Sequence, residues 1–282
     1  MKAIIFNLCA WVMLPIMDGF AKYLSLTLPV LQITWSRYFF TVVIVLPIML
    51  VFFRKNLTWT ERPKLQLIRG LLLFSANILF FYSISIISLA KALTLAFIAP
   101  LIVTALSPLL LGEKVGFRRW AAVITGFIGS LIVIRPGFVE INLASVAALG
   151  TGVLYGFYLI VTRKLHNSDN PLLTLFLTGV VGAVIGTLIM PTVWVQPTIN
   201  EWYMMFAIGF FASLGHLFLI LSLKYADASK LAPFGYFEIV TNIIIGYYFF
   251  NHFPDAWHFL GLFIIISSGI YIFRRQIYYK SN

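Results

Sequence analysis

Cysteine and charged residues are scarce in this chain of 282 residues. Cys9 is the only cysteine, which excludes an intrachain disulfide and a zinc site built from cysteines. Charged residues make up 10% of the chain, against about 25% in soluble globular proteins. So few charges cannot cover a soluble domain with polar groups, and we therefore expect most of the surface to face lipid.

Hydrophobic residues make up 61% of the chain, against about 45–50% in soluble domains. A bilayer core requires about 20 predominantly apolar residues per helix. Charged residues, proline and glycine divide the chain into ten such runs, which predict an all-α integral membrane protein. The expected spans are 3–24, 31–53, 66–89, 91–111, 117–135, 143–163, 171–191, 202–224, 228–250 and 256–273. The short junctions 88–92 and 225–229 are expected to be tight helical hairpins.

A cleavable signal peptide is the competing interpretation of the first run. The run argues against it, because it continues beyond residue 20, carries Asp18 and Lys22, and lacks a small-residue cleavage site. We expect it to be the first spanning helix.

The net charge of +11 would suggest a nucleic-acid partner in a soluble protein. Here the basic residues alternate with the spans. With the N-terminus in the cytoplasm, 16 of the 20 lysines and arginines fall on the cytoplasmic side, as the positive-inside rule requires. Lys22, Lys91 and Arg135 fall at outer ends, and Arg37 falls within a span. The pattern predicts a multi-pass inner-membrane protein with both termini in the cytoplasm and no nucleic-acid partner.

The second half of the chain repeats the first. Helices 3 to 5 align with helices 8 to 10 at an offset of 139 residues, which places Lys91 on Lys230. Helices 1 and 6 align at an offset of 142, which places Lys22 on Lys164. Five helices in each half, 1–137 and 138–282, force the halves to cross the membrane in opposite directions. Such inverted repeats are typical of secondary transporters, which bind substrate near the midplane between the repeats.

Several stretches resemble the drug/metabolite transporter superfamily, and specifically two EamA-type repeats of five helices. They are Ala-Pro-Leu-Ile-Val-Thr-Ala-Leu-Ser-Pro-Leu-Leu-Leu-Gly-Glu (99–113), Arg-Arg-Trp-Ala-Ala-Val-Ile-Thr-Gly-Phe-Ile-Gly (118–129), Ile-Arg-Pro-Gly (134–137) and Ala-Asp-Ala-Ser-Lys-Leu-Ala-Pro-Phe-Gly-Tyr-Phe-Glu (226–238). The second repeat has Asn251 and His252 where the usual pattern has Gly-Glu. The resemblance implies a carrier that takes a small organic solute through the lipid bilayer, with a coupling proton or an exchange substrate.

Two further stretches are similar to the subgroup that includes riboflavin-type and S-adenosylmethionine-type uptake carriers. They are Met-Asp-Gly-Phe-Ala-Lys-Tyr-Leu (17–24) and Leu-Pro-Val-Leu-Gln-Ile-Thr-Trp-Ser-Arg (28–37). Uptake of a vitamin or cofactor-like solute is the function that this resemblance implies. Export of amino acids or drugs is the alternative within the superfamily.

The motifs of intramembrane enzymes and ATP-driven pumps are missing from the sequence. It has no His-Glu-x-x-His cluster, no Gly-x-Ser-x-Gly turn and no Gly-x-x-x-x-Gly-Lys-Ser/Thr loop. A channel is a further alternative, but the polar positions are clustered rather than continuous along a pore. We expect a carrier that is not an enzyme and that needs no metal or other cofactor.

Three charged residues are expected in the outer half of the membrane. Asp18 and Lys22 are four residues apart and share a helix face. Arg37 lies about 9 Å below the outer start of the second span. One interpretation is a charge network that ties the first two helices together. The other is an outer gate, or a grip on an anionic group of the substrate, which the guanidinium fork of Arg37 suits.

Glu238 is expected near the middle of the ninth span, and Asn242 lies one turn further on the same face. A midplane carboxylate suits proton coupling or a cationic substrate group, although neighbouring donors could also hold it in a purely structural role. His216 lies in the inner half of the eighth span, where a structural role is the more common one for a single histidine.

Amide and aromatic side chains in the middle of their spans complete the predicted substrate site. They are Asn77, Tyr82, Tyr155 and Tyr158, which Trp11, Trp35 and Tyr236 could join. Aromatic rings would stack on a flat ring system, and the polar groups would orient it. Riboflavin suits an aromatic cavity, whereas S-adenosylmethionine suits Glu238 together with Arg37.

Small residues and prolines are expected to control helix packing. Gly182 and Gly186 form a Gly-x-x-x-Gly pair, and Thr125 with Gly129 forms a similar patch, so that neighbouring helices can approach closely. Pro15, Pro100 and Pro108 are expected to kink their helices.

Overall fold

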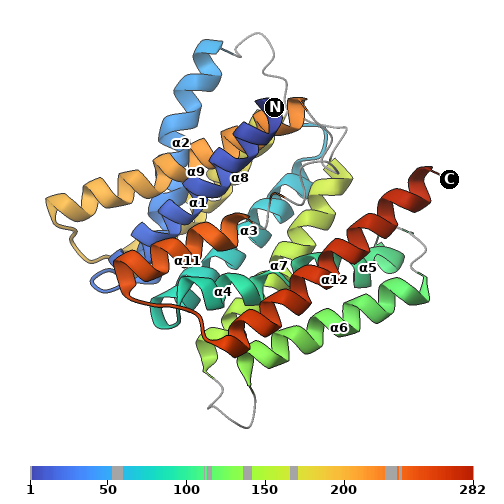
Figure 1. Cartoon of the computed structure of the whole chain (residues 1–282). Helices are drawn as coiled ribbons and strands as arrows, with labels where there is room; N and C mark the ends of the chain where they lie inside the picture. The colour runs from blue at the N-terminus through green and yellow to red at the C-terminus, as the bar shows by residue number, and fades with distance from the viewer. Residues whose placement is uncertain are drawn as a thin grey trace.

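The chain folds into a bundle of α-helices in the computed structural model (Figure 1). The structure describes residues 2–52, 60–110, 112, 116–135, 142–165, 171–225, 234 and 237–281. The helices in chain order are α1 (Lys2–Leu24), α2 (Val30–Phe52), α3 (Pro63–Ile86), α4 (Leu89–Ala96), α5 (Ala99–Leu110), α6 (Phe117–Ile134), α7 (Leu143–Leu165), α8 (Pro171–Val193), α9 (Ile199–Tyr225), α11 (Phe237–Phe250) and α12 (Ala256–Ser281). The described ranges contain no strand, in keeping with the all-α expectation.

Seven helical runs in the described part of the chain are long and apolar enough to cross a membrane. They are α1, α2, α3, the run Leu89–Leu110 that contains α4 and α5, α7, α8 and α9. Three further apolar helices are shorter, namely Trp120–Ile134, Phe237–Phe250 and Ala256–Tyr271. The break between helices predicted at 88–92 is confirmed, because α3 ends at Ile86 and α4 begins at Leu89. The hairpin predicted at 225–229 falls largely outside the described residues.

Four helix pairs make the most extensive contacts in the bundle. They are α1 with α9, α6 with α12, α3 with α7, and α2 with α8. In Figure 1, α1 lies along α9, and α12 runs beside α6 at the opposite edge. Each pair joins a helix of the first half of the sequence to one of the second half, so the two halves interlock instead of forming separate bundles.

The run expected as one span over 91–111 is interrupted. Helix α4 ends at Ala96, and α5 begins at Ala99. Pro100 has no N–H to donate to the carbonyl of Ala96, so the helical hydrogen-bond ladder cannot continue there. A Cβ atom on Gly152 of α7 would lie 2.8 Å from the Ala96 carbonyl oxygen, so a glycine is needed for α7 to pack against the break. Helices α1 and α5 continue through Pro15 and Pro108.

The predicted glycine pair on α8 lies directly against α2. A Cβ atom on Gly182 would come within 2.4 Å of the Tyr38 ring, and one on Gly186 within 2.8 Å of the Trp35 ring. Trp35 also donates a hydrogen bond from Nε1 to Thr187 Oγ1 of α8, over 2.9 Å. The small residues therefore allow two aromatic rings of α2 to pack into the surface of α8, and the close helix approach predicted for the glycine pair is confirmed.

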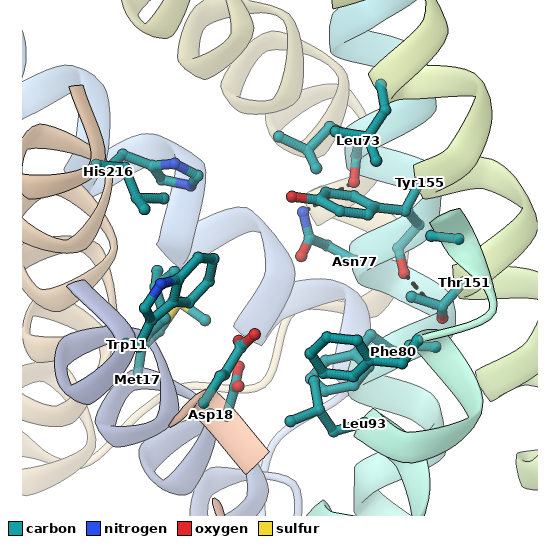
Figure 2. Close-up of a pocket in the computed structure, with 18 of the residues that line it drawn as sticks. Trp11, Met17, Asp18, Leu73, Asn77, Phe80, Leu93, Thr151, Tyr155 and His216 are labelled. Carbon is teal, nitrogen blue, oxygen red and sulfur yellow. Dashed lines mark hydrogen bonds between the residues drawn. The ribbon is translucent and has the colours of Figure 1, made fainter. Parts of the chain in front are cut away.

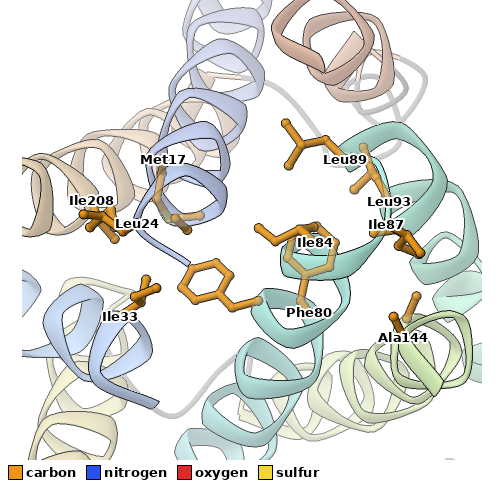
Figure 3. Packing of buried hydrophobic residues seen from close by; sticks show 14 of the residues in the cluster. Met17, Leu24, Ile33, Phe80, Ile84, Ile87, Leu89, Leu93, Ala144 and Ile208 are labelled. Atoms are coloured by element: carbon orange, nitrogen blue, oxygen red, sulfur yellow. The ribbon is translucent and has the colours of Figure 1, made fainter. Parts of the chain in front are cut away.

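A buried hydrophobic cluster, called the packed end below, closes one end of the bundle (Figure 3). Most of its residues lie where α1, α3 and α8 end and where α2, α4, α7 and α9 begin, and α6, α11 and α12 contribute one residue each. The largest members include Leu24, Ile33, Phe80, Phe81, Ile84, Leu89 and Met205. The cluster itself is apolar, and the buried ammonium group of Lys22 beside it donates to two carbonyl oxygens at the end of α3.

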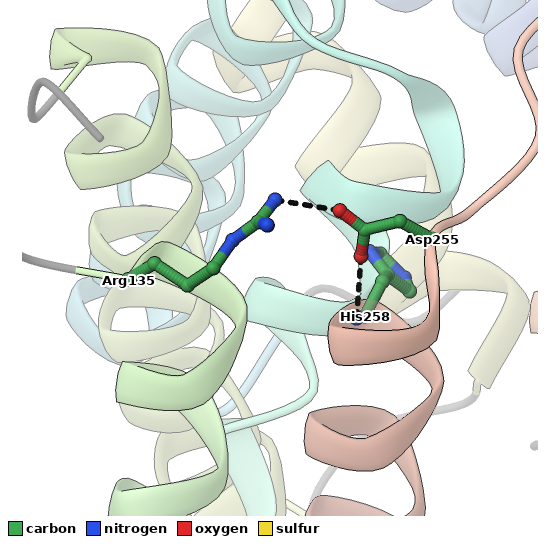
Figure 4. Close-up of polar contacts among 3 residues, drawn as sticks. All are labelled: Arg135, Asp255 and His258. Carbon is green, nitrogen blue, oxygen red and sulfur yellow. Dashed lines mark hydrogen bonds and ion pairs between the residues drawn. The ribbon is translucent and has the colours of Figure 1, made fainter. Parts of the chain in front are cut away.

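Polar contacts at the start of α12 connect it to α4 and α6 (Figure 4). Asp255 accepts a hydrogen bond from the backbone N–H of His258 over 2.8 Å and caps the helix. It also forms an ion pair of 2.6 Å with Arg135, which ends α6 in a left-handed conformation. The ring of His258 lies 2.9 Å from the hydroxyl of Thr94 on α4. One short segment thus joins three helices.

Candidate functional site

A cavity of about 210 Å³ lies between the helices beside the packed end (Figure 2). Met17, Phe80 and Leu93 belong both to the packed end and to the cavity wall. The polar side chains of the wall are Asp18, Arg37, Asn77, Thr151, Tyr155, His216 and Glu238. Its aromatic side chains also include Trp11, Phe80 and Phe97. The wall is therefore mostly apolar with a few polar groups, as in ligand sites generally.

Six of the residues predicted for the substrate site and the charge network meet in this cavity. They are Asp18 on α1, Arg37 on α2, Asn77 on α3, Tyr155 on α7, His216 on α9 and Glu238 on α11. Each comes from a different helix, so the cavity exists only when six helices are assembled.

Arg37 lies at the centre of the polar side of the cavity. Its guanidinium donates one hydrogen bond to the Asn77 side-chain oxygen and lies 3.3 Å from His216 Nε2. Because a guanidinium only donates, His216 Nε2 must accept, and the ring is neutral with its proton on Nδ1. Both hydrogen-bond partners of Arg37 are uncharged, and its positive charge acts electrostatically on Asp18 of the same cavity wall.

Asn77 is held on both sides. Its amide nitrogen donates to the Tyr38 hydroxyl and to the Leu73 carbonyl oxygen, the latter over 2.8 Å. These bonds fix the side-chain amide so that its oxygen faces Arg37. The Tyr38 ring also lies 5.5 Å from the Arg37 guanidinium carbon. The orientation of Arg37 is thus determined by neighbours from α2, α3 and α9.

Two carboxyl groups lie on the wall of the same cavity. Asp18 is 3% exposed, and its Oδ1 atom has no hydrogen-bond partner among the described residues. Glu238 lies in the first turn of α11, where the helix dipole favours negative charge, and it is close enough for Asp18 to act on it electrostatically. In Figure 2 the Asp18 carboxyl group points into the cavity, across from Phe80 and Asn77.

Two tyrosines on α7 lie one turn apart and have different environments. The Tyr155 ring lines the cavity and stacks on Tyr158, with ring centroids 5.2 Å apart. Tyr158 is outside the cavity wall, and its hydroxyl accepts a hydrogen bond of 2.5 Å from Arg69. The structure therefore separates a lining tyrosine from a supporting one.

Arg69 is one of the 16 basic residues predicted to lie on the cytoplasmic side, and in the structure it is the centre of a buried polar cluster. It is buried on α3 and donates to Thr162 of α7 over 2.8 Å, to the Thr174 carbonyl of α8 over 3.2 Å, and to Thr178. With Tyr158, these contacts lock α3, α7 and α8 together. The signal that could have identified it is its position inside the expected span 66–89.

Three other predicted residues lie outside the cavity wall. Lys22 donates to the carbonyl oxygens of Ile84 and Ile87 at the end of α3, over 2.5 and 2.9 Å. Asn242 donates to the Glu238 carbonyl one turn earlier, over 3.1 Å, and Tyr82 packs against the packed end. Tyr236 lies outside the described residues.

Trp11 faces the cavity as the sequence suggested, whereas Trp35 packs on α8. The indole Nε1 of Trp11 donates to Asn7 over 2.8 Å, and Asn7 in turn donates to Ser222 of α9 over 3.3 Å. This chain of bonds holds the ring in place. No group of three or more metal-binding side chains occurs in the part of the chain that the structure describes.

The sequence matches the EamA-like transporter family twice, over residues 1–135 and over residues 142–274. The chain belongs to the EamA-like transporter family. The S-adenosylmethionine uptake transporter of Rickettsia bellii (strain RML369-C) is 30% identical over 255 residues, which cover 90% of this chain and 87% of the relative. The riboflavin transporter of Vibrio cholerae is 26% identical over 277 residues, with coverage of 96% and 93%. These matches confirm the resemblance to the uptake subgroup.

A further relative is named for export instead of uptake. The pseudopaline exporter CntI of Pseudomonas aeruginosa (strain UCBPP-PA14) is 26% identical over 264 residues, with coverage of 93% of this chain and 92% of the relative. A solved crystal structure shares the fold, with a TM-score of 0.66 at 16% identity over 95% of this chain and 94% of the other. The family and these relatives identify the chain as a membrane transporter rather than an enzyme.

Proposed function

We propose that this EamA-family chain is a secondary active transporter that moves a small organic metabolite across the inner membrane by alternating access. The cavity carries the proposal, because Asp18, Arg37 and Glu238 face it from helices of both halves. An ionisable residue inside a membrane helix costs roughly 2.5–3.5 kcal/mol on insertion scales. Bringing three such residues to one cavity is a large cost for a purely structural device, and a polar solute can offset it.

Ten membrane crossings are part of the proposal. The seven long apolar helical runs and the three shorter ones together supply ten. A shorter helix still crosses a bilayer that thins locally or that receives flanking residues. With both termini in the cytoplasm, α1 runs outward and the packed end lies at the outer face, so the cavity is closed toward the outside.

An inverted repeat of 1–137 and 138–282 is supported by the helix contacts. In such a repeat α1 corresponds to α7, α2 to α8, α3 to α9, and α6 to α12. Exchanging the halves turns the α1–α9 contact into the α7–α3 contact, and the α2–α9 contact into the α8–α3 contact; all four occur. The pairs α2–α8 and α6–α12 are converted into themselves. This pattern is what a two-fold relation between interlocked halves requires.

Uptake of a cofactor-like solute is the direction and substrate class that we favour. The relatives named for S-adenosylmethionine uptake and riboflavin transport support it. The charged side chains of the cavity favour a charged solute such as S-adenosylmethionine over riboflavin, which has no charge to pair with them. Trp11 and Tyr155 are assigned to ring stacking, and Arg37 to an anionic group.

Alternating access also needs a source of energy. Glu238 is the proposed carrier of a coupling proton, because it is a carboxyl group on the cavity wall. Exchange of one solute for another is the other possibility. The cavity of about 210 Å³ is smaller than typical ligand pockets of about 300–1,000 Å³, so it must widen to take a whole cofactor.

Export is the second candidate function, and the match to the relative named pseudopaline exporter favours it. Counterflow in proteoliposomes tests the main proposal and separates these candidates. Vesicles loaded with unlabelled S-adenosylmethionine or riboflavin should accumulate the labelled compound. Trans-stimulation supports a carrier, and its absence for all candidate solutes, from both sides of oriented vesicles, contradicts the proposal. A pH gradient that drives uptake supports proton coupling, and uptake that depends only on internal solute supports exchange.

A further inference from the structure

Asp18 lines the cavity and has a carboxyl oxygen without a hydrogen-bond partner among the described residues, and we infer that this oxygen accepts a hydrogen bond from an ammonium group of the transported solute. The inference rests on the proposed transport function and specifies the chemistry of its substrate. Glu238 supplies a second carboxyl group on the same wall, and Arg37 is available for a carboxylate of the same solute.

The first argument for the inference is the environment of Asp18. The residue is 3% exposed, and Oδ1 lacks a hydrogen-bond partner among the described residues. A buried acceptor without a partner costs about 1–3 kcal/mol, and more when it is charged. The carboxyl group points into the cavity instead of toward a neighbouring helix (Figure 2). Because Oδ1 is enclosed in this conformation, a donor on the solute reaches it when the cavity widens to take the solute.

The second argument is that the hydrogen bonds of the neighbouring cations go to groups other than Asp18. Lys22, one turn along α1, donates to two carbonyl oxygens at the end of α3. Arg37 is held by Asn77 and His216. The ion pair found within the described ranges joins Arg135 to Asp255, at another place in the bundle. Asp18 therefore has no hydrogen bond with Lys22 one turn away, although Arg37 is close enough to act on it electrostatically.

The third argument is the distribution of charge over the cavity. Arg37 on α2 has only neutral partners, and the two carboxyl groups come from α1 and α11. The wall thus presents one positive and two acidic groups, none of them in an ion pair within the described part of the chain. A solute with both an ammonium and a carboxylate group satisfies this pattern, whereas a neutral ring system leaves every charge unpaired.

The unpartnered Oδ1 atom of Asp18 is a hydrogen-bond acceptor, and this restricts the class of cation that it can bind. An ammonium group offers N–H donors, whereas a sulfonium or a quaternary ammonium has none. The expected solute therefore carries a free primary or secondary amine beside a carboxylate, as an amino-acid moiety does. The apolar and aromatic rest of the wall is left for the body of the molecule.

Competition in counterflow tests the inference. Proteoliposomes of the full chain take up labelled S-adenosylmethionine in the presence of S-adenosylhomocysteine, which keeps the amine, or of its N-acetyl derivative, which lacks the ammonium charge. The free amine should compete about 10- to 100-fold better in the wild type, as expected for a hydrogen bond to a charged group. In Asp18→Asn this ratio should fall severalfold, because the oxygen that remains is uncharged.

Two variants serve as controls. Asp18→Glu keeps a carboxylate and should retain a preference for the free amine. Glu201→Gln removes a carboxylate at the start of α9, outside the cavity, and should leave the ratio unchanged. Thermal unfolding in detergent establishes that each variant is folded. If Asp18→Asn does not fold, the wild-type ratio and the Asp18→Glu ratio decide, and a wild-type ratio near one overturns the inference.

The outcomes separate the inference from the proposed function. Transport of S-adenosylmethionine with an unchanged amine preference in Asp18→Asn overturns the inference alone. Transport of riboflavin with no effect of amine-bearing competitors also overturns it and leaves a transporter. A folded wild type that exchanges no solute in either direction contradicts the proposed function, and the inference with it.

Discussion

Asp18 and Lys22 are one turn apart on α1, and both are buried, with exposed fractions of 3% and 7%. Lys22 points into the packed end, where two carbonyl oxygens from the end of α3 accept its hydrogen bonds. Asp18 points into the cavity, where its Oδ1 atom has no partner among the described residues. The same helix face thus carries one charged group with two hydrogen-bond partners and one carboxyl oxygen without a partner among the described residues.

The difference separates a stabilising charge from one available to a ligand. A lysine at the C-terminal end of a helix is favoured by the helix dipole and by free carbonyl groups. A carboxyl group left without a donor costs stability, and a fold keeps such a cost when a ligand uses the group. The packed end should therefore respond to mutation through stability, and the cavity through transport.

The largest effect on stability is expected from the packed end. Phe81 is 1% exposed, and Phe81→Ala should lower the free energy of unfolding by about 3–5 kcal/mol, because it leaves a cavity among close-packed side chains. Phe249→Ala is the matched control, since Phe249 is 78% exposed. Thermal unfolding in detergent measures both, and equal midpoints would show that the packed end is not tightly packed.

The next largest effect is expected for the two charged residues of α1, whose substitutions should change stability to different extents. Lys22→Met removes the donor for the Ile84 and Ile87 carbonyl oxygens and should cost about 1–3 kcal/mol of stability. Asp18→Asn removes an acidic group without an ion partner and should leave the unfolding midpoint unchanged or higher. A large loss of stability in Asp18→Asn would mean that Asp18 is a structural residue and that the contrast on α1 is wrong.

Arg37→Gln should reduce transport with little change in stability. The substitution keeps a hydrogen-bond donor toward Asn77 but removes the charge that faces the cavity. We expect uptake of a carboxylate-bearing solute to fall about tenfold or more, as for the loss of a charged hydrogen bond. Initial uptake rates, normalised to the amount of protein in the vesicles, measure the effect. Unchanged transport would mean that Arg37 has only the structural role of connecting neighbouring helices.

The smallest effect is expected at the Arg135–Asp255 ion pair. Burial alone raises the pKa of Asp255, but the hydrogen bond from the His258 N–H and the Arg135 guanidinium outweigh it and hold the pKa below its usual range. A carboxylate with a lowered pKa stabilises the fold above the unfolded pKa of about 3.9 and loses this as the pH falls through the folded value. Because the pair is partly exposed, Asp255→Asn should cost only about 0–1 kcal/mol.

The role of this ion pair is checked by measuring the unfolding midpoints as a function of pH. The difference in unfolding midpoint between the wild type and Asp255→Asn should stay constant from pH 8 to about pH 5 and shrink only below about pH 4, where the wild-type carboxylate becomes protonated. A difference that already shrinks near neutral pH would contradict the lowered pKa.

The helices could be predicted from the sequence because each apolar run reveals its own span. The expected end of the first span at residue 24 matches Leu24, and the break after α3 lies where it was predicted. The break between α4 and α5 was expected only as a kink. Its form depends on Gly152 of α7, which lies beside it, and contact between distant segments is not written in the local pattern.

The candidate site could be predicted in part, for a related reason. Counting residues gives the depth of a side chain along a helix, but a helix that is apolar on all sides does not reveal which face points inward. Asp18 and Tyr155 face the cavity, whereas Lys22 and Tyr158, each within about one turn of them, turn to other partners. The partners of Arg69 on α7 and α8 could not be inferred either, because they are far away in the sequence.

The bond from Lys22 to the end of α3 has a consequence for the order of assembly. Lys22 is synthesised 62 residues before Ile84, one of its two acceptors. At about 5–20 residues per second, the ammonium group waits roughly 3–12 s for that carbonyl group. During this interval we expect it to stay in the headgroup region, where a long lysine side chain can reach water. We therefore expect the first helix to reach its final depth only after the third has been inserted and offers its carbonyl groups to Lys22.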